Sequence, residues 1–255
     1  MSPPPSAPAP MIDVQDLYKS FKGFPVLKGV KLQIPEGTTA VILGASGSGK
    51  TVLMKHIMGL FKPDRGHVMV DGQNISAMDR QELAVFRERM GMVFQSSALF
   101  DSMTVGDNVA FPLREHNPGL SEPQISEKVK EKLAVVDLHG VEQKYPAELS
   151  GGMRKRVGLA RAIVREPKIV LYDEPTTGLD PLTTESVDEM IIHARERLSV
   201  TSVVISHDIG SAFHIADRIA VINEGRIVEE GTPAEVRRTK EPFTRHFLAT
   251  WFGRT

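Results

Sequence analysis

The stretch Gly44-Ala-Ser-Gly-Ser-Gly-Lys-Thr51 matches the pattern G-x-x-x-x-G-K-[ST] at every specified position. The residues before it, Thr39–Leu43, are apolar and mostly β-branched, which predicts a buried strand. The residues after it, 52–59, carry apolar side chains at helical spacing and end at Gly59, which predicts a helix. A strand, a glycine-rich loop and a helix in this order are typical of a phosphate-binding loop in an α/β fold.

Strands and helices alternate along the rest of the ordered chain, which we expect to begin near Met11. Strands are expected over 67–72, 91–95, 169–173 and 201–207, and a hairpin over 218–231 with its turn at Glu224 and Gly225. Helices are expected over 80–89, 122–136, 151–164 and 183–197. This alternation predicts an α/β fold with a mostly parallel sheet. We find no convincing strand over 97–165, so an all-helical insertion is expected there.

The composition excludes several classes of protein. The 255 residues carry a net charge of −1, so the molecule as a whole has no electrostatic attraction to nucleic acid or to an anionic membrane. The chain has no cysteine, which excludes a disulfide framework and thiol chemistry. No run approaches the 18 apolar residues of a membrane span. Residues 1–10, MSPPPSAPAP, are rich in proline and predict an extended, disordered tail.

The glycine-rich loop predicts a nucleotide site. Its small residues let successive backbone N–H groups point at phosphate oxygens, and the helix N-terminus adds a partial positive charge. Lys50 is expected to reach the β- and γ-phosphates, and the Thr51 hydroxyl to bind Mg²⁺. The residues expected to hold the nucleotide here are Gly44, Ala45, Ser46, Gly47, Ser48, Gly49, Lys50, Thr51 and Val52.

Polar residues end three other predicted strands, where the ligands of a parallel sheet gather. Asp173 is expected to give a second Mg²⁺ contact, and Glu174 to accept a proton from the water that attacks the γ-phosphorus. His207 is expected to donate a hydrogen bond to the γ-phosphate. Gln95 is expected to bind a metal-bound water and the nucleotide. The catalytic candidates are therefore Glu174, His207, Lys50 and Gln95, and the metal candidates are Thr51, Gln95 and Asp173.

Residues 149–153, Leu-Ser-Gly-Gly-Met, form a second candidate phosphate cradle. Ser150 is a good N-cap, but Gly151 and Gly152 would cost a bare helix about 1 kcal/mol each, so they indicate close approach of a ligand. The chain's first loop already holds its own nucleotide. Two incomplete sites predict a symmetric head-to-tail pair, in which Ser150, Gly151, Gly152 and Met153 close over the partner's γ-phosphate.

The order of these segments resembles the ATP-binding-cassette family. The phosphate loop, Gln95, LSGGM, LYDEP, TTGLD and His207 follow one another as in that family, over residues 12 to 232. The resemblance implies a P-loop NTPase (RecA-like) core, an antiparallel β subdomain and an inserted helical subdomain. It implies a homodimer that uses ATP and Mg²⁺ and hydrolyses ATP to ADP and phosphate.

The resemblance also implies roles for further residues. Asp180 of TTGLD should lie at the dimer seam and couple the two sites. Phe21 should stack on adenine, with Tyr18 as the alternative, and Val26 should pack beside the base. Met153 departs from the usual glutamine, so its contact with the partner's nucleotide should be apolar.

LSGGM together with FQSSALFDSMTVGDNVAFPLREH (94–116) is similar to the branch that energises phospholipid traffic with mammalian-cell-entry-type substrate-binding proteins. This likeness implies a peripheral ATPase on the cytoplasmic face of the inner membrane. Its partners would be membrane permease subunits and small accessory or substrate-binding subunits, not nucleic acid. The segment after Gln95 is unusually apolar, with Ala98, Leu99, Phe100, Met103 and Val105. Most of these side chains are expected to pack into the helical insertion, and some to remain in an exposed groove for a short permease helix.

Other functions are open from the sequence. The cargo of a transporter could be an amino acid or a lipoprotein. A cassette acting on DNA or ribosomes usually has a long coiled coil or a second cassette, and neither occurs here. A P-loop kinase for small molecules would not need LSGGM.

Residues 233–255 predict a helical tail. Apolar side chains from Phe243 to Phe252 share one helical face, which also carries Phe247, Leu248 and Trp251. The pattern allows docking on the chain's own core or on a neighbouring subunit, and the lipid-transport resemblance favours a neighbour.

Overall fold

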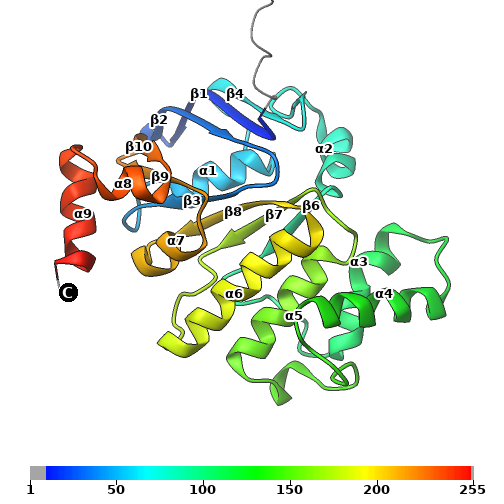
Figure 1. The fold of residues 1–255 in the computed structure, drawn as a ribbon. Helices are drawn as coiled ribbons and strands as arrows, with labels where there is room; N and C mark the ends of the chain where they lie inside the picture. The colour runs from blue at the N-terminus through cyan, green and yellow to red at the C-terminus, as the bar shows by residue number, and fades with distance from the viewer. Residues whose placement is uncertain (1–9, 254–255) are drawn as a thin grey trace, which may run out of the picture.

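The computed structural model describes residues 10–253, which form two sheets and a block of helices (Figure 1). The larger described sheet has the strand order β10-β9-β3-β8-β7-β6. The strands from β9 to β6 pair in parallel, and β10 at the edge is antiparallel. The prediction of an α/β fold with a mostly parallel sheet is confirmed. The bounds are β3 (Thr39–Leu43), β6 (Met90–Val93), β7 (Ile169–Asp173), β8 (Thr201–Ser206), β9 (Arg218–Asn223) and β10 (Arg226–Gly231).

An antiparallel sheet, in the order β2-β1-β4-β5, lies over the first (Figure 1). The sequence pattern predicted β4 but missed the hairpin of β1 and β2. The pairing register of β1 shifts between Val14 and Leu17, where Asp16 takes a positive φ of 46°. Such a bulge breaks the alternation of apolar and polar residues that marks a strand. The bounds are β1 (Ile12–Phe21), β2 (Phe24–Ile34), β4 (Arg65–Val70) and β5 (Gln73–Asn74).

Each face of the parallel sheet is covered by a buried core. On β3, Val41 and Leu43 belong to the core shared with helices α5 and α6, whereas Ala40 and Ile42 belong to the core under the antiparallel sheet. Both faces are buried, so β3 reads as a continuous apolar run and not as an alternating one. The phosphate loop therefore begins on a strand that is fixed from both sides.

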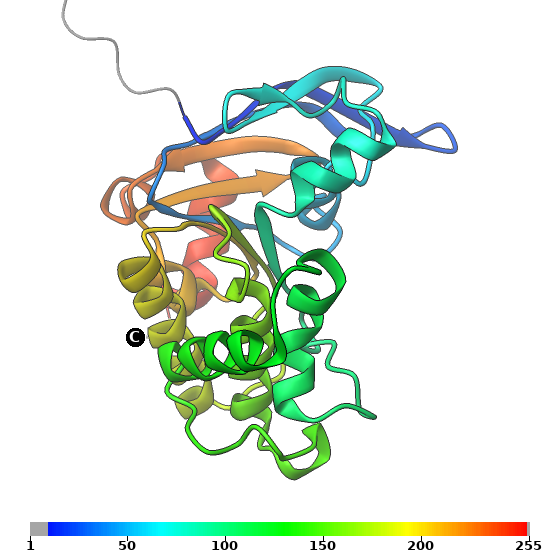
Figure 2. The ribbon, with the colours of Figure 1, turned by 90° about the vertical axis from the view of Figure 1, so that its right-hand side faces the viewer.

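The segment between β6 and β7 is helical, as predicted, and no strand is found among its described residues (Figures 1 and 2). The sequence pattern missed α3, because Pro112 lies inside it. None of the described helices is long and apolar enough to cross a membrane. The bounds are α1 (Lys50–Ile57), α2 (Arg80–Arg87), α3 (Val105–His116), α4 (Glu122–Val135), α5 (Gly151–Ile163), α6 (Pro181–Leu198), α7 (Ile209–Ile215), α8 (Pro233–Arg237) and α9 (Pro242–Phe252).

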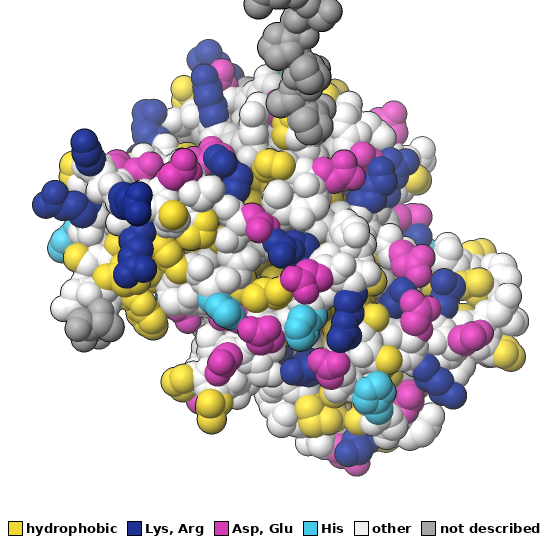
Figure 3. Space-filling model, in the orientation of Figure 1, with side chains coloured by type: hydrophobic (Ala, Val, Ile, Leu, Met, Phe, Trp, Pro, Cys, Tyr) yellow, Lys and Arg dark blue, Asp and Glu magenta, His cyan; other side chains and the backbone are white. Residues whose placement is uncertain are grey.

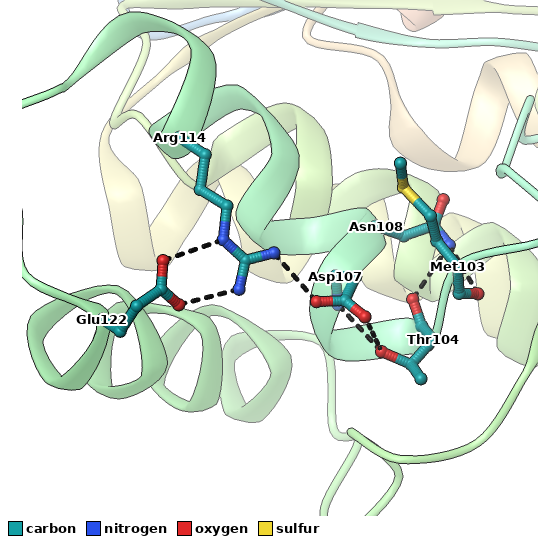
Figure 4. A network of polar contacts seen from close by, with 6 residues as sticks. All are labelled: Met103, Thr104, Asp107, Asn108, Arg114 and Glu122. Carbon is teal, nitrogen blue, oxygen red and sulfur yellow. Dashed lines mark hydrogen bonds and ion pairs between the residues drawn. The ribbon is translucent and has the colours of Figure 1, made fainter.

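Polar contacts fix α3 within this block (Figure 4). The fully buried Asn108 amide donates to the carbonyl oxygen of Met103 at 3.2 Å. The Arg114 guanidinium donates to Asp107 and to Glu122, each at 2.8 Å. The Arg114 contacts are half exposed, so they orient α3 against α4 more than they stabilise the fold.

The C-terminal helix α9 docks on its own chain. It contacts α7, α8 and β10. Leu248 is 5% exposed and joins the core of helices α5 and α6, with Phe243 and Phe252 packed against it. The tail was predicted to dock either on the chain's own core or on a neighbouring subunit, with the neighbour preferred. In this structure the described part of the tail docks on its own core.

We predict that Gly91→Ala lowers the free energy of unfolding by about 1–3 kcal/mol, the usual effect of overpacking. A Cβ on Gly91 of β6 would lie 2.5 Å from the Ala162 carbonyl oxygen of α5. Gly119→Ala is the control, because a Cβ there meets no atom within 4 Å. Urea denaturation measures both, and equal stability of the two variants would contradict this packing.

Candidate active site

Four neighbouring parallel strands bring the predicted site residues to one edge of the sheet. The phosphate loop follows β3, Glu174 follows β7 and His207 follows β8, while Gln95 lies just beyond β6. A cavity of about 880 Å³ opens at this edge. The predicted residues that line it are Val26, Ala45, Ser46, Gly47, Gly49, Lys50, Thr51, Val52, Gln95, Asp173, Glu174 and His207. Two further residues, Thr177 and Phe247, line the cavity and were not predicted as site residues from the sequence.

The phosphate loop is folded for an anion that approaches its backbone. Gly49, the residue before α1, has a φ of 110°, a conformation that favours glycine, and it gives α1 no side-chain cap. The first N–H groups of α1 are therefore free for a ligand. The Ser48 hydroxyl is buried without a hydrogen-bond partner, which also fits a polar ligand in this loop.

Lys50 lies buried under the loop, with 6% of its surface exposed. Its ammonium donates to the carbonyl oxygens of Gly44 at 2.7 Å and Ala45 at 3.1 Å. It also lies 3.6 Å from Glu174 Oε1. Burial lowers the pKa of Lys50, and the charge of Glu174 partly offsets this effect. A bound phosphate would bring further negative charge to this buried ammonium and so stabilise its charged form.

Glu174 is held from three sides. His207 Nδ1 lies 2.5 Å from Oε2, and the Thr177 hydroxyl donates to the same oxygen at 2.9 Å. A carboxylate only accepts, so His207 must carry its proton on Nδ1. The Glu174 backbone takes a positive φ of 51° and donates its N–H to the Ile205 carbonyl oxygen at 3.0 Å. This left-handed conformation is unusual for glutamate and turns its side chain toward Lys50.

The metal candidates fit Mg²⁺ by their chemistry. Thr51, Gln95 and Asp173 line the same cavity and offer hydroxyl, amide and carboxylate oxygens, the ligands that this hard cation prefers. Burial is the main cause that raises the pKa of Asp173, and the negative charge of the neighbouring Glu174 adds to the rise.

The second cradle lies outside this cavity. Ser150, Gly151, Gly152 and Met153 begin α5, where the Ser150 hydroxyl accepts from the Met153 N–H at 3.2 Å. A Cβ on Gly151 would meet no atom within 4 Å, so nothing in the described part of the chain requires glycine there. Asp180 also lies outside the cavity and caps α6 through the N–H groups of Leu182 and Thr183.

The adenine candidates stand apart from the cavity lining. Phe21 is 38% exposed, and its ring packs edge-on against Phe61 at 5.3 Å. Tyr18 lies 5.4 Å from the Arg65 guanidinium. Val26 does line the cavity, whereas neither aromatic residue does. The stacking of Phe21 or Tyr18 on a base stays a prediction.

Two cationic side chains tie the cradle helix to the loop that follows β6. Lys155 of α5, 5% exposed, donates to the Gln95 carbonyl oxygen. Arg161 donates to the carbonyl oxygens of Ser97 and Ala98, each at 2.7 Å. A movement of α5 would therefore carry the backbone of Gln95 with it.

A groove of about 630 Å³ lies between α2, α3 and α5, beside β6. Of the residues predicted for such a groove, Ala98 and Phe100 line it, and Phe100 is 42% exposed. Val105 is fully buried and Leu99 packs into the core, so the segment divides between core and groove, as expected.

A buried hydrogen bond joins the helices that follow Asp180 and His207. The Ser211 hydroxyl of α7 donates to Asp188 of α6 at 2.5 Å, and Asp188 is 3% exposed. Burial raises the pKa of Asp188 to about 6, above its ordinary value of 3.8. This bond links two segments that border the candidate site.

Comparison with known proteins identifies a family and several relatives. The family model described as "ABC transporter" matches residues 27–177. The probable ribonucleotide transport ATP-binding protein mkl of Mycobacterium tuberculosis is 43% identical over 93% of this chain, which spans 66% of that protein's length. The intermembrane phospholipid transport system ATP-binding protein MlaF of Escherichia coli is 40% identical over 94% of this chain and 89% of its own length.

Solved structures agree with the sequence comparison. CbiO1 of Clostridium perfringens, part of the transporter complex cbiONQ, superposes with a TM-score of 0.85 at 30% identity, over 96% of this chain and 97% of that one. The dimeric bacterial ABC transporter cassette MJ0796 superposes with a TM-score of 0.78 at 33% identity, over 88% of this chain and 99% of that one.

We predict that Asp188→Asn changes how stability depends on pH. The pKa of Asp188 is raised in the folded chain, so its contribution to stability is present below about pH 4 and lost as the pH rises through 6. The asparagine side chain would not titrate and would still accept from Ser211. Relative to wild type, the variant should gain about 2 kcal/mol in free energy of unfolding between pH 4.5 and pH 7.5.

Urea denaturation of both chains at the two pH values measures this difference. His214, Asp208 and Glu189 act on Asp188 and are present in both chains, so the comparison isolates the change at position 188. An equal difference at both pH values would show that Asp188 is not the titrating group.

Proposed function

Because the chain belongs to the ABC transporter family and is an ATPase of that family, we propose that it hydrolyses ATP to power phospholipid transport through separate membrane permease subunits. The observation that carries the catalytic part is the position of Glu174. Its carboxylate lies between the Lys50 ammonium and the His207 ring, in the cavity that the phosphate loop opens. No other described carboxylate except Asp173 lines that cavity.

The residues of the cavity divide the work of hydrolysis. The loop N–H groups and Lys50 bind and orient the phosphates. Thr51, Gln95 and Asp173 would hold Mg²⁺, which neutralises phosphate charge when bound. Glu174 accepts the proton of the attacking water. His207 holds that carboxylate through its Nδ1–H. Its Nε2 would donate toward the γ-phosphate when both ring nitrogens carry a proton. Lys50 leaves its bonds to Gly44 and Ala45 when phosphate offers a stronger, charged acceptor.

We propose that the complete site is shared by two chains. The cradle of Ser150, Gly151 and Gly152 is absent from its own chain's cavity, and Gly151 has open space around it. A head-to-tail pair would place this cradle on the γ-phosphate of the partner, with Asp180 at the seam and Met153 making an apolar contact. ATP then favours the closed pair, and hydrolysis releases it.

The permease partner is supported by the groove beside β6. Its exposed apolar residues, including Phe94 and Phe100, suit a short amphipathic helix. Closure of the pair would move α5, and the contact of Lys155 with Gln95 would pass this movement to the loop after β6. That loop also carries groove residues, including Phe100. We place the chain on the cytoplasmic face of the inner membrane, with mammalian-cell-entry-type subunits as further partners.

Phospholipid is the favoured cargo, because the relative from a phospholipid transport system is matched over more of its own length than the relative named for ribonucleotide transport. The phospholipid-system relative matches over 89% of its own length, the ribonucleotide one over 66%. An amino acid is the second candidate, because the methionine import ATP-binding protein MetN 2 of Pseudomonas aeruginosa is 39% identical over 93% of this chain and 72% of its own length. Nucleic acid is not expected, since the net charge of the chain is −1. On the face drawn in Figure 3, acidic side chains lie among the basic ones.

Glu174→Gln should bind ATP but hydrolyse it about 10²–10⁴-fold more slowly, because the general base is lost while the shape is kept. The variant should accumulate as an ATP-bound dimer in light scattering. Glu36→Gln, on an exposed turn, is the matched control and should turn over normally. Rapid turnover by Glu174→Gln would remove the assigned base.

The cargo is tested by purifying the tagged chain in its native membrane complex. We expect permease subunits to co-purify and mass spectrometry to find phospholipid in excess over the surrounding membrane. A complex that carries methionine and no enriched phospholipid would favour an importer of amino acids instead.

A further inference from the structure

The two oxygens of the Glu174 carboxylate have different environments. His207 Nδ1 and the Thr177 hydroxyl both donate to Oε2, at 2.5 Å and 2.9 Å. Each oxygen of a carboxylate has about two lone pairs, so these two donors fill Oε2. The other oxygen, Oε1, lies at the longer distance of 3.6 Å from the Lys50 ammonium. The carboxylate is therefore held firmly at one oxygen and loosely at the other.

A tight turn fixes the position of Thr177. Its backbone N–H donates to the Glu174 carbonyl oxygen at 3.3 Å, which closes a turn over residues 174–177. The two residues inside the turn, Pro175 and Thr176, are buried. Threonine is β-branched and has few side-chain rotamers, so little freedom is lost when its hydroxyl meets Oε2. The turn that presents the carboxylate thus also presents a donor to it.

Binding of ATP would leave Oε1 as the oxygen that can accept a proton. In the proposed function Lys50 turns to phosphate, whereas the two donors at Oε2 stay in place. The attacking water then gives a proton to Oε1 while its oxygen bonds to the γ-phosphorus. The bond from the γ-phosphorus to ADP breaks, and its electron pair leaves on ADP.

We propose that Thr177 is a positioning residue for hydrolysis, whose hydroxyl holds Oε2 of Glu174 so that Oε1 accepts the proton of water. The inference rests on the proposed function, because it needs Glu174 as the base. The last torsion of a glutamate side chain is broad, so one donor limits its rotation poorly. The His207 side chain is itself 55% exposed. A second donor on the same oxygen restricts the rotation that would exchange the two oxygens.

Thr177→Val keeps the shape of the side chain and removes the donor. In the full chain, purified in its membrane complex, kcat should fall about tenfold, the usual effect of losing a hydrogen bond to a charged group. The ATP concentration at half-saturation should change by less than about twofold, because Thr177 acts on the base and not on ATP binding. Thr177→Ser keeps a hydroxyl and should recover most of the rate.

A double variant shows whether Thr177 acts through Glu174. In the Glu174→Gln background, Thr177→Val should change the residual single-turnover rate by less than about twofold, because the base that it positions is already absent. Thr38→Val is the matched control. It removes a hydroxyl that donates to the Pro35 carbonyl oxygen at 2.8 Å, before β3 and outside the cavity, and it should keep the wild-type kcat.

The outcomes separate this inference from the function on which it rests. Wild-type turnover by Thr177→Val, or an equal loss of rate with and without the Glu174 carboxylate, would overturn the role of Thr177 and leave the ATPase assignment intact. A loss of rate in Thr177→Ser as large as in Thr177→Val would do the same. Thr177→Ala replaces Thr177→Val if the latter does not fold. Rapid turnover by Glu174→Gln alone would remove the base, and this inference with it.

Discussion

Parallel pairing of β3, β8, β7 and β6 forces these strands to end at one edge of the sheet, and the chemistry of the chain depends on that constraint. It brings the phosphate loop, the acidic pair and the histidine into one cavity although they are distant in sequence. In that cavity Glu174 is bonded to His207 and lies near Lys50, so the proposed base is positioned before any nucleotide arrives. Because β3 is buried on both faces, it holds the start of the phosphate loop in place when phosphate binds.

The two half-sites that we propose for one chain are connected by hydrogen bonds. Helix α5 begins with the proposed cradle for a partner's nucleotide, and its Lys155 donates to the carbonyl oxygen of Gln95, which belongs to the chain's own cavity. The Asp188–Ser211 bond likewise joins the helix after Asp180 to the helix after His207. Closure around ATP can therefore be transmitted through short, buried contacts to the groove beside β6, without a large rearrangement inside either subdomain.

Local sequence patterns predicted most of this arrangement. They failed for elements and site residues whose position depends on tertiary contacts. The strands of the parallel sheet are visible as apolar runs, and the glycine-rich loop predicts the phosphate site at the end of β3. The hairpin of β1 and β2 was missed because the bulge at Asp16 breaks its alternation, and α3 because Pro112 interrupts its pattern. Thr177 reaches the site through the left-handed turn at Glu174, and Phe247 through docking of a distant helix. Neither carries a local signal. Phe21 was predicted from resemblance, and its ring packs on Phe61 outside the cavity lining.

The central claim is that a complete catalytic centre exists only between two chains. A cryo-microscopy or crystal structure of the ATP-loaded Glu174→Gln protein tests it most directly. The account predicts Ser150 and the two glycines of each chain in contact with the triphosphate on the other chain's loop. Residues 149–153 found remote from every bound nucleotide would contradict it.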